Sequence, residues 1–285
     1  MEGGRSMRIL HPTDFSQTAG KALAIARDIR DSTGGSLHVM HTQSRFEEGL
    51  AGARVRPHID SINPQLDARK EEQRSDEARR LREMLQHVAS PDSTSELRWG
   101  DPFKELLDMH GDYDLVVMGA HGNNRFDNYF LGGVAGRFVR RAKIPVITVR
   151  EETVVTNIKR VLVATDFESS APAAVAFAKR LRAFGTKLVL CHIIDDPRLA
   201  AERGYINTVT DSLNLLDDGE FERHVIKEGS PVDLLPQVAQ DVGAQLIAIG
   251  VRHHRATTGL LFGSRADALI RSSPVPVLSV PALTD

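Results

Sequence analysis

Residue types that mark several classes of protein are scarce in this chain. Among its 285 residues Cys191 is the only cysteine, so no disulfide can form within the chain. This usage suits a reducing compartment, and we expect a cytoplasmic protein. No apolar run approaches the eighteen or so residues that span a membrane, and the first residues lack the charged-then-apolar order of a signal peptide. We therefore expect no membrane partner.

The charge and the motifs do not favour nucleic-acid binding, serine-based catalysis or metal binding. Lys and Arg number 36 against 38 Asp and Glu, a net charge of −2, whereas nucleic-acid-binding domains usually present a basic face. We therefore expect no nucleic-acid partner. No histidine and carboxylate accompany a suitable serine, so we predict no catalytic residue. His253 and His254 are adjacent, and adjacent histidines on a loop rarely reach one ion, so we predict no metal site.

The chain repeats its own pattern. Residues 9–29 align with residues 161–181 at a constant offset of 152, which places Asp14 opposite Asp166. Three later pairs of segments also match: LHVMHT (37–42) with LVLCHI (188–193), DLVVMGAHG (114–122) with QLIAIGVRH (245–253), and IPVITV (144–149) with VPVLSV (275–280). A repeat of this length indicates two copies of one structural unit. We infer two domains, 1–150 and 151–285, with a boundary in the polar stretch 151–157.

The order of segments within each copy predicts an α/β fold. Apolar runs alternate with helix-like segments, and continuously apolar runs indicate strands that are covered on both faces. Such strands, joined by helices, form a doubly wound parallel sheet with right-handed crossovers. Ligands of these sheets bind beyond the carboxyl ends of the strands, where the winding reverses. Asp14 and Gly119 each come at the end of an expected strand, and we expect both at one crevice.

A glycine-rich segment follows the fourth expected strand. MGAHGNNRFDNYFLGGVAG (118–136) holds five glycines, and Gly132 and Gly133 precede a helix-like run. Glycine lets a ligand approach the backbone without a Cβ in the way, and the free N–H groups of a helix N-terminus bind phosphate. The segment therefore predicts a phosphate-binding loop in two separated parts. It lacks the lysine and hydroxyl of a Walker loop and the tight glycine spacing of a dinucleotide-binding turn.

The first copy also carries extra residues between its second and third strands. The apolar residues of 69–88 lie on one helical stripe, which predicts a long amphipathic helix that covers the sheet. The polar residues 47–63 are interpreted as a lid over the first pocket or as an arm that contacts a partner. The matching part of the second copy, 196–219, is shorter, so its pocket should be covered differently.

The motifs together resemble those of universal stress proteins. The nucleotide motif of that family is glycine, two residues, glycine, nine residues, glycine, then serine or threonine. At this spacing the first copy has Gly119, Gly122, Gly132 and Gly133, and the second has Gly250, His253, Gly263 and Ser264. PTDF and ATDF also resemble the end of the family's first strand. The chain resembles a tandem universal stress protein over nearly its whole length.

The resemblance implies a fold and a ligand. The fold is a five-stranded sheet of order 3-2-1-4-5 in each copy, the copies being related by a pseudo-two-fold axis, with the last strands paired between domains. The ligand is ATP in many members. Carried over residue by residue, the first-copy nucleotide-binding set is Thr13, Asp14, Thr42, Met118, Gly119, Gly122, Arg125, Gly132, Gly133 and Val134. The matching second-copy set is Asp166, Ile193, Gly250, His253, Gly263, Ser264 and Arg265.

Each copy departs from the family motif at one position. Gly133 stands where the family has a hydroxyl, which keeps the backbone N–H and loses one side-chain hydrogen bond, about 0.5–1.5 kcal/mol. His253 stands where the family has glycine, and its imidazole either fills the space of the nucleotide or donates to a phosphate. Filling that space costs more than losing one bond. We therefore expect nucleotide mainly in the first copy. We expect the second copy to have a degenerate site or to bind a different ligand.

The resemblance implies a stress-response regulatory protein that binds an adenine nucleotide, namely ATP with or without Mg²⁺. The alternatives are a slow ATPase, the most that we expect of it as an enzyme, and a nucleotide-free interaction scaffold. A homodimer of such chains and an unidentified protein partner are compatible with each of these functions.

Purely structural roles stay open for several of these residues. Asp14 and Asp166 suit turns that lead into helices. His41 and His192 end matching strands, and we interpret them as packed, hydrogen-bonded histidines. Cys191 lies in an apolar strand, as expected of a small buried hydrophobic residue.

Overall fold

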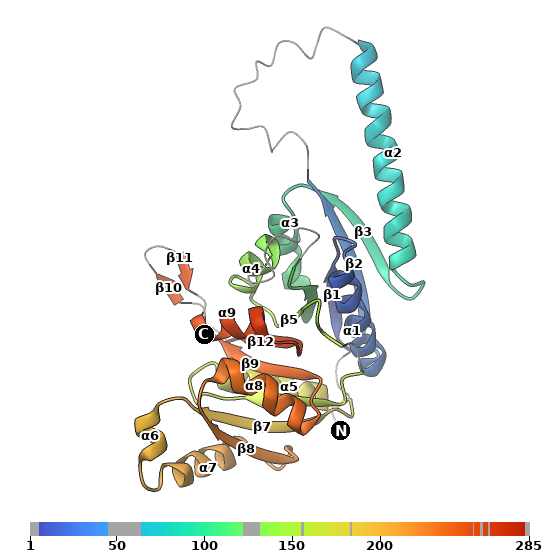
Figure 1. Ribbon diagram of the computed structural model, residues 1–285. Helices are drawn as coiled ribbons and strands as arrows, with labels where there is room; N and C mark the ends of the chain where they lie inside the picture. The colour runs from blue at the N-terminus through green and yellow to red at the C-terminus, as the bar shows by residue number, and fades with distance from the viewer. Residues whose placement is uncertain are drawn as a thin grey trace.

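The computed structural model describes residues 6–44, 64–121, 132–154, 157–182, 184–252, 254–256, 259–261 and 263–282 (Figure 1). The elements of the first half are β1 (Arg8–Pro12), α1 (Gln17–Thr33), β2 (Ser36–Gln43), α2 (Pro64–Val88), β3 (Thr94–Trp99), α3 (Pro102–Met109), the 3-10 helix η3 (His110–Asp112), β4 (Leu115–Gly119), α4 (Gly133–Val139) and β5 (Val146–Val149). Those of the second half are β6 (Arg160–Ala164), α5 (Ala171–Arg182), β7 (Lys187–Ile194), α6 (Pro197–Ala201), α7 (Tyr205–Leu216), β8 (Arg223–Glu228), α8 (Pro231–Val242), β9 (Leu246–Val251), β10 (His254–Ala256), β11 (Gly259–Leu261), α9 (Ser264–Ser272) and β12 (Val277–Pro281).

Capping residues define the ends of the main helices. Ser16 precedes α1, and its side chain accepts a hydrogen bond from the N–H of Ala19, one of the donors that a helix N-terminus leaves free. The helix stops at Gly34, whose φ of 58° is the left-handed conformation that glycine adopts without strain. Helix α8 ends in the same way at Gly243, with φ 66°. Short-range sequence signals therefore set these boundaries.

Ten of the described strands form one continuous sheet, in the order β3-β2-β1-β4-β5-β12-β9-β6-β7-β8, and β10 pairs with β11 in a separate antiparallel sheet. In each half of the ten-stranded sheet all neighbouring strands are parallel, and each half has the order 3-2-1-4-5. The predicted fold class, two doubly wound α/β units in one chain, is confirmed.

The two halves join through an antiparallel pair of equivalent strands. β5 pairs with β12, and Ile147 lies opposite Leu278, its own counterpart at the offset of 131. On either side Val277 lies opposite Thr148, and Ser279 lies opposite Val146. Because exchanging each residue for its counterpart leaves this set of pairs unchanged, the strand pair has two-fold symmetry about Ile147 and Leu278. The predicted pairing of the last strands is confirmed, and it covers an edge that each half alone would expose.

Helices cover both faces of the sheet, and alternate residues along a strand belong to different layers. Ile9 packs in the layer that includes α1 and α5, whereas Leu10 packs in the layer that includes α3, α4, α8 and α9. Both layers run across the two halves without a break. The strands are therefore buried on both faces, as their continuous apolar sequences predict.

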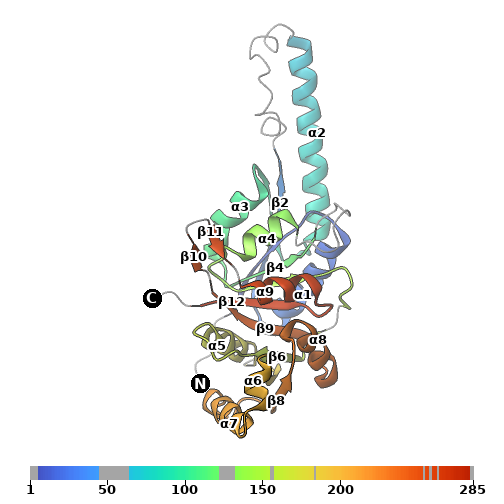
Figure 2. The same cartoon turned by 60° about the vertical axis from the view of Figure 1, so that its left-hand side comes forward.

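Helix α2 covers the sheet only with its last turns. Ala78 and Leu85 are buried, as the predicted stripe requires, whereas most other described side chains before residue 85 are exposed. The helix begins at Pro64, five residues before the predicted start, and its first half stands clear of the sheet in both Figure 1 and Figure 2. The predicted amphipathic helix that covers the sheet is therefore confirmed for its last turns, and the prediction is wrong for its first half. The loop interpreted as a lid or an arm, 47–63, lies outside the described residues.

A buried carboxylate links the halves on the helix side. Asp267 of α9 is 8% exposed and accepts a hydrogen bond of 2.7 Å from Nη2 of Arg140, which directly follows α4. The guanidinium of Arg271, one turn further along α9, contacts the other carboxylate oxygen. Two cations thus balance one carboxylate at the junction between the halves.

Replacing Asp267 by alanine should destabilise the chain by about 1–2 kcal/mol, because both arginines lose their partner although each retains some water. The measurement is the urea midpoint followed by circular dichroism. Glu220→Ala is the control, because Glu220 forms only a surface pair with Arg182, at 3.7 Å, and should cost less than about 0.5 kcal/mol. Equal losses in the two variants would contradict a role for Asp267 at the junction.

Candidate functional site

Both halves form the same tight turn after their first strand. In the first half Phe15 has φ 61°, a conformation that a bulky residue rarely adopts. Two local hydrogen bonds support it: Thr13 Oγ1 accepts from the N–H of Phe15 at 3.1 Å, and Asp14 Oδ1 accepts from the N–H of Ser16 at 3.0 Å. The structural interpretation of Asp14 as a turn residue is confirmed. One carboxylate oxygen serves the turn, and the exposed carboxylate retains further acceptor capacity.

The second half repeats this turn atom for atom. Phe167 has φ 59°. Thr165 Oγ1 accepts from the N–H of Phe167, and Asp166 Oδ1 accepts from the N–H of Glu168, both at 3.0 Å. A strained residue held by two side chains indicates that this turn has a definite shape. It presents an exposed carboxylate at the carboxyl end of β6.

A histidine from the neighbouring strand supports each turn. His41 Nδ1 is 2.7 Å from the carbonyl oxygen of Thr13, and His192 Nδ1 is 2.8 Å from that of Thr165. Each ring also packs on the phenylalanine of its turn, with 4.6 Å between ring centroids. Because a carbonyl only accepts, each Nδ1 carries a proton and donates it to the turn. The prediction of packed, hydrogen-bonded histidines is confirmed.

A cavity of about 580 Å³ opens at the carboxyl ends of the second-half strands. Its lining includes the strand-end turn, the end of β9 and the start of α9. All the described members of the predicted second-copy set line it, namely Asp166, Ile193, Gly250, Gly263, Ser264 and Arg265. His253 lies outside the described residues. The two separated parts of the glycine motif and the strand-one carboxylate therefore meet at one cavity in this half.

Gly119, the last residue of β4, and Gly250, the last but one of β9, have a packing role. A Cβ on Gly250 would lie 2.3 Å from the carbonyl oxygen of Ser170, immediately before α5. A Cβ on Gly119 would lie 3.1 Å from Cγ2 of Thr18 in α1. In both halves the strand end touches the start of a helix, and at Gly250 the contact leaves no room for a side chain. We predicted these glycines from the approach of a ligand, and the contact that the structure displays is with a helix.

The second part of the motif is open. Gly263 is the N-cap of α9, and a Cβ there would meet nothing within 4 Å. No side chain caps this nine-residue helix. The first N–H groups of a helix have no partner within it and carry partial positive charge. Because Gly263, Ser264 and Arg265 are exposed and line the cavity, this wall suits an anionic group.

The described first-half residues reach the corresponding sheet edge. Thr13 and Asp14 follow β1, and the N–H of Gly132 donates to the carbonyl of Ala120 at 2.8 Å, which places the start of α4 next to the end of β4. Gly133 is as open as Gly263, and Val134 and Thr42 are half-buried. Met118 is buried, and its side chain packs in the core. Gly122 and Arg125 lie outside the described residues.

A model of the universal stress protein family matches residues 6–150 and, separately, residues 157–281. The chain belongs to the universal stress protein family. It is similar to universal stress proteins of Mycobacterium tuberculosis and Mycobacterium bovis, each 27% identical in an alignment 199 residues long that covers 65% of this chain and 67% of the relative. A crystal structure of a universal stress protein from Archaeoglobus fulgidus is similar in fold, with a TM-score of 0.69 and 24% identity, over 98% of this chain and 100% of that one.

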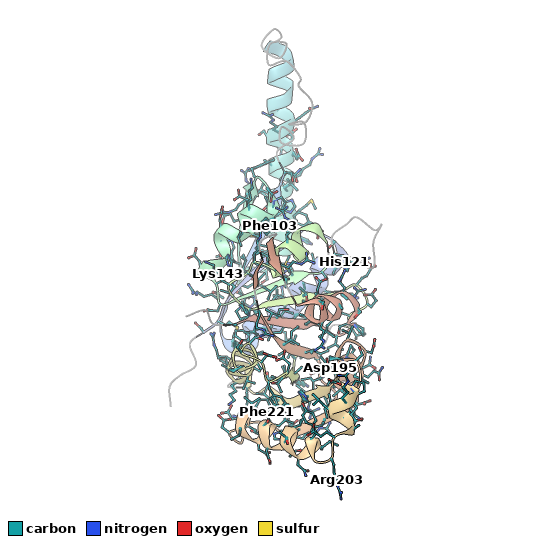
Figure 3. The ribbon with its side chains drawn as sticks, turned by 90° about the vertical axis from the view of Figure 1, so that its left-hand side faces the viewer. Phe103, His121, Lys143, Asp195, Arg203 and Phe221 are labelled. Carbon is teal, nitrogen blue, oxygen red and sulfur yellow. The ribbon has the colours of Figure 1, made fainter. Side chains whose placement is uncertain are left out.

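Four charged residues of this tandem universal stress protein form two ion pairs at the second-half cavity, and the sequence did not predict that they would come together. Arg265 pairs with Asp195, which follows β7 and is labelled in Figure 3, and Arg252 Nη1 lies 3.1 Å from Glu168 Oε2. All four residues line the cavity. Only Arg265 was among the predicted residues. Glu168 and Arg252 lie inside matched segments but face uncharged or weakly basic residues there, Asp195 lies two positions beyond one, and no periodic signal marks any of the three.

Two further expectations concern reactive groups. Burial raises the pKa of Cys191 to about 12, so its thiol stays protonated and behaves as the predicted hydrophobic residue. Within the described ranges no three histidine, cysteine, aspartate or glutamate side chains are grouped so that they could hold a metal ion.

No helix in the described part of the chain has the length and apolar character to cross a membrane.

Proposed function

We propose that this universal stress protein is a regulatory protein that binds an adenine nucleotide, with ATP as the expected ligand. The observation that carries the proposal is the second-half cavity, where the strand-one carboxylate, the end of β9 and the open N-terminus of α9 meet. About 580 Å³ is within the usual range for small-molecule sites. Family membership adds support, because universal stress proteins often bind ATP.

The lining has parts suited to each portion of such a ligand. Ile193, Val232 and Leu235 supply apolar surface for a base. Asp166 supplies an exposed acceptor for the hydroxyl or amino groups of a nucleoside, and the N–H groups at Ser264 and Arg265 suit phosphate. Any Mg²⁺ would then be held chiefly by the phosphates of the nucleotide, as is usual for this ion.

The proposal extends to the first half, which we expected to be the main site. Its described residues include the same turn and the same open glycine before α4. The expectation of a weaker second site depended on His253, and the cavity favours giving the second half equal weight. Binding stoichiometry therefore decides whether one half or both halves hold nucleotide.

The first test is to release small molecules from the purified protein and identify them by mass spectrometry, followed by calorimetric titration with ATP. We expect an adenine nucleotide. Asp14→Asn and Asp166→Asn form a matched pair, because asparagine keeps the oxygen that supports each turn and removes the charge. Each should weaken binding in its own half by about tenfold, the usual loss of a hydrogen bond to a charged group.

The pair also separates the alternatives. If only one variant changes the titration, the half that it belongs to is the site. If neither adenosine nor any adenine nucleotide binds, the proposal is wrong and a scaffold function is favoured. Phosphate released from ATP by the wild type and lost in one of the variants would instead identify a slow ATPase.

A further inference from the structure

Two ion pairs link opposite walls of the second-half cavity. Arg265, at the start of α9, reaches Asp195 at the end of β7. Arg252, at the end of β9, reaches Glu168 in the turn after β6, with 3.1 Å between Nη1 and Oε2. Each pair thus joins the wall that carries the glycine motif to the wall that carries a strand-end carboxylate. Arg265 and Glu168 are 68% and 53% exposed, so the pairs lie at the solvent side of the cavity.

The first half lacks the equivalents of these four residues. At the repeat offsets the first half has uncharged or weakly basic residues in the same places, namely Ser16, Ser44, His121 and Val134. Neither pair can form there, because no carboxylate and no arginine is present at these positions. Since the first half makes the same sheet and the same turn without them, the pairs are not a requirement of the fold.

The energetics allow the pairs to exchange partners. Exposed arginine–carboxylate pairs contribute little to stability, because water and salt screen them. A phosphate chain carries more charge than one carboxylate and accepts two parallel hydrogen bonds from a guanidinium. A ligand with several phosphates can therefore displace Asp195 and Glu168 from their arginines. An uncharged nucleoside offers nothing in exchange, so both pairs stay closed beside it.

We propose that Arg265–Asp195 and Arg252–Glu168 form a charge latch, which opens for ligands with two or more phosphates and stays closed for uncharged ones. The latch makes the second half selective for the phosphate chain, and the first half has none of these four residues at the equivalent positions. This inference rests on the proposed nucleotide-binding function for its biological ligand, and the latch itself is testable with inorganic triphosphate.

The experiment is a calorimetric titration of the full chain with three probes: ATP, inorganic triphosphate and adenosine. Asp195→Asn releases Arg265 and should tighten the binding of ATP and triphosphate in the second half about threefold to fivefold, the scale of an exposed ion pair. Arg265→Gln should weaken both by about tenfold or more. Adenosine affinity should not change in either variant. Asp218→Asn and Arg182→Gln make the same changes of net charge at surface pairs that do not line the cavity, and they should leave all three affinities unchanged.

The outcomes separate the latch from the proposed function. Equal effects of Asp195→Asn on adenosine and on ATP, or effects no larger than those of Asp218→Asn, overturn the latch while nucleotide binding stands. Triphosphate binding that depends on Arg265, without binding of adenosine or ATP, supports the latch and rejects the nucleotide. Failure of all three probes to bind rejects both.

Discussion

Replacing Gly250 by alanine is expected to destabilise the second half severely, by about 3 kcal/mol or more. The added Cβ would lie 2.3 Å from the carbonyl oxygen of Ser170 and 2.5 Å from its carbonyl carbon. Both are backbone atoms, so no side chain can rotate away, and β9 must move relative to α5. Because β9 lies between β12 and β6 in the continuous sheet, the displacement reaches the junction of the halves. Urea denaturation followed by circular dichroism measures the loss.

Two other glycines of the same motif provide matched controls. Gly263→Ala meets nothing within 4 Å and should cost less than about 1 kcal/mol, the usual range for an N-cap change. Gly119→Ala meets the methyl group of Thr18 at 3.1 Å and should give an intermediate loss of about 1 kcal/mol. A Gly250→Ala protein that folds normally yet binds no nucleotide would contradict this ranking, and would return Gly250 to the ligand-binding role that the motif first suggested.

The glycine motif therefore combines two different requirements. The glycine at the end of the strand provides room for a neighbouring helix, as the short distances at Gly119 and Gly250 demonstrate. The glycine that precedes the next helix keeps its N-terminus open, as at Gly133 and Gly263. A sequence pattern records only that glycine occurs at both places. It does not tell a packing requirement from a binding requirement, since both exclude a Cβ.

The sequence predicted the fold well because the fold depends on patterns that repeat. Continuous apolar runs indicated strands covered on both faces, and the constant offsets between copies implied two equivalent units. The pairing of Ile147 with Leu278 follows from that equivalence, because identical edges can cover each other only around a two-fold axis. The turn at Asp14 and Asp166 was one of two roles that the sequence left open, since aspartate side chains readily accept from the N–H two residues ahead.

The rest depended on contacts between distant residues. Asp195 and Arg265 are far apart in sequence and meet only because β7 and α9 end at the same cavity. No periodicity connects them, so their pairing was not predicted. The same limit applies to the first half of α2. Helix-forming residues predict a helix, but they do not indicate whether the helix packs against another part of the protein. Figure 2 shows that much of this helix packs against no other part of the described chain.

The second large effect expected is a loss of stability in mild acid caused by His11. This residue of β1 is fully buried, and its Nδ1 lies 2.8 Å from the carbonyl oxygen of Val117. Burial, the dominant cause, lowers its pKa from 6.5 to about 4, although the hydrogen bond to Val117 opposes the shift. The unfolded chain therefore binds a proton between pH 6.5 and pH 4 that the folded chain does not. Stability should fall by about 3 kcal/mol as the pH drops through that window, and it should be fully present above pH 6.5.

The chain itself supplies the variant that tests this linkage, because the repeat places Val163 at the position equivalent to His11. In His11→Val the carboxylates that titrate in acid are unchanged, and only the imidazole is lost. The free energy of unfolding, measured in urea at a series of pH values from 8 to about 4.5, should therefore decline less steeply in the variant. His87→Gln is the control, since it also removes one imidazole, from a histidine that is exposed on α2. Identical slopes for wild type and His11→Val would mean that the folded protein accepts a proton at His11 as readily as the unfolded chain does, and that burial in β1 carries no penalty for its charge.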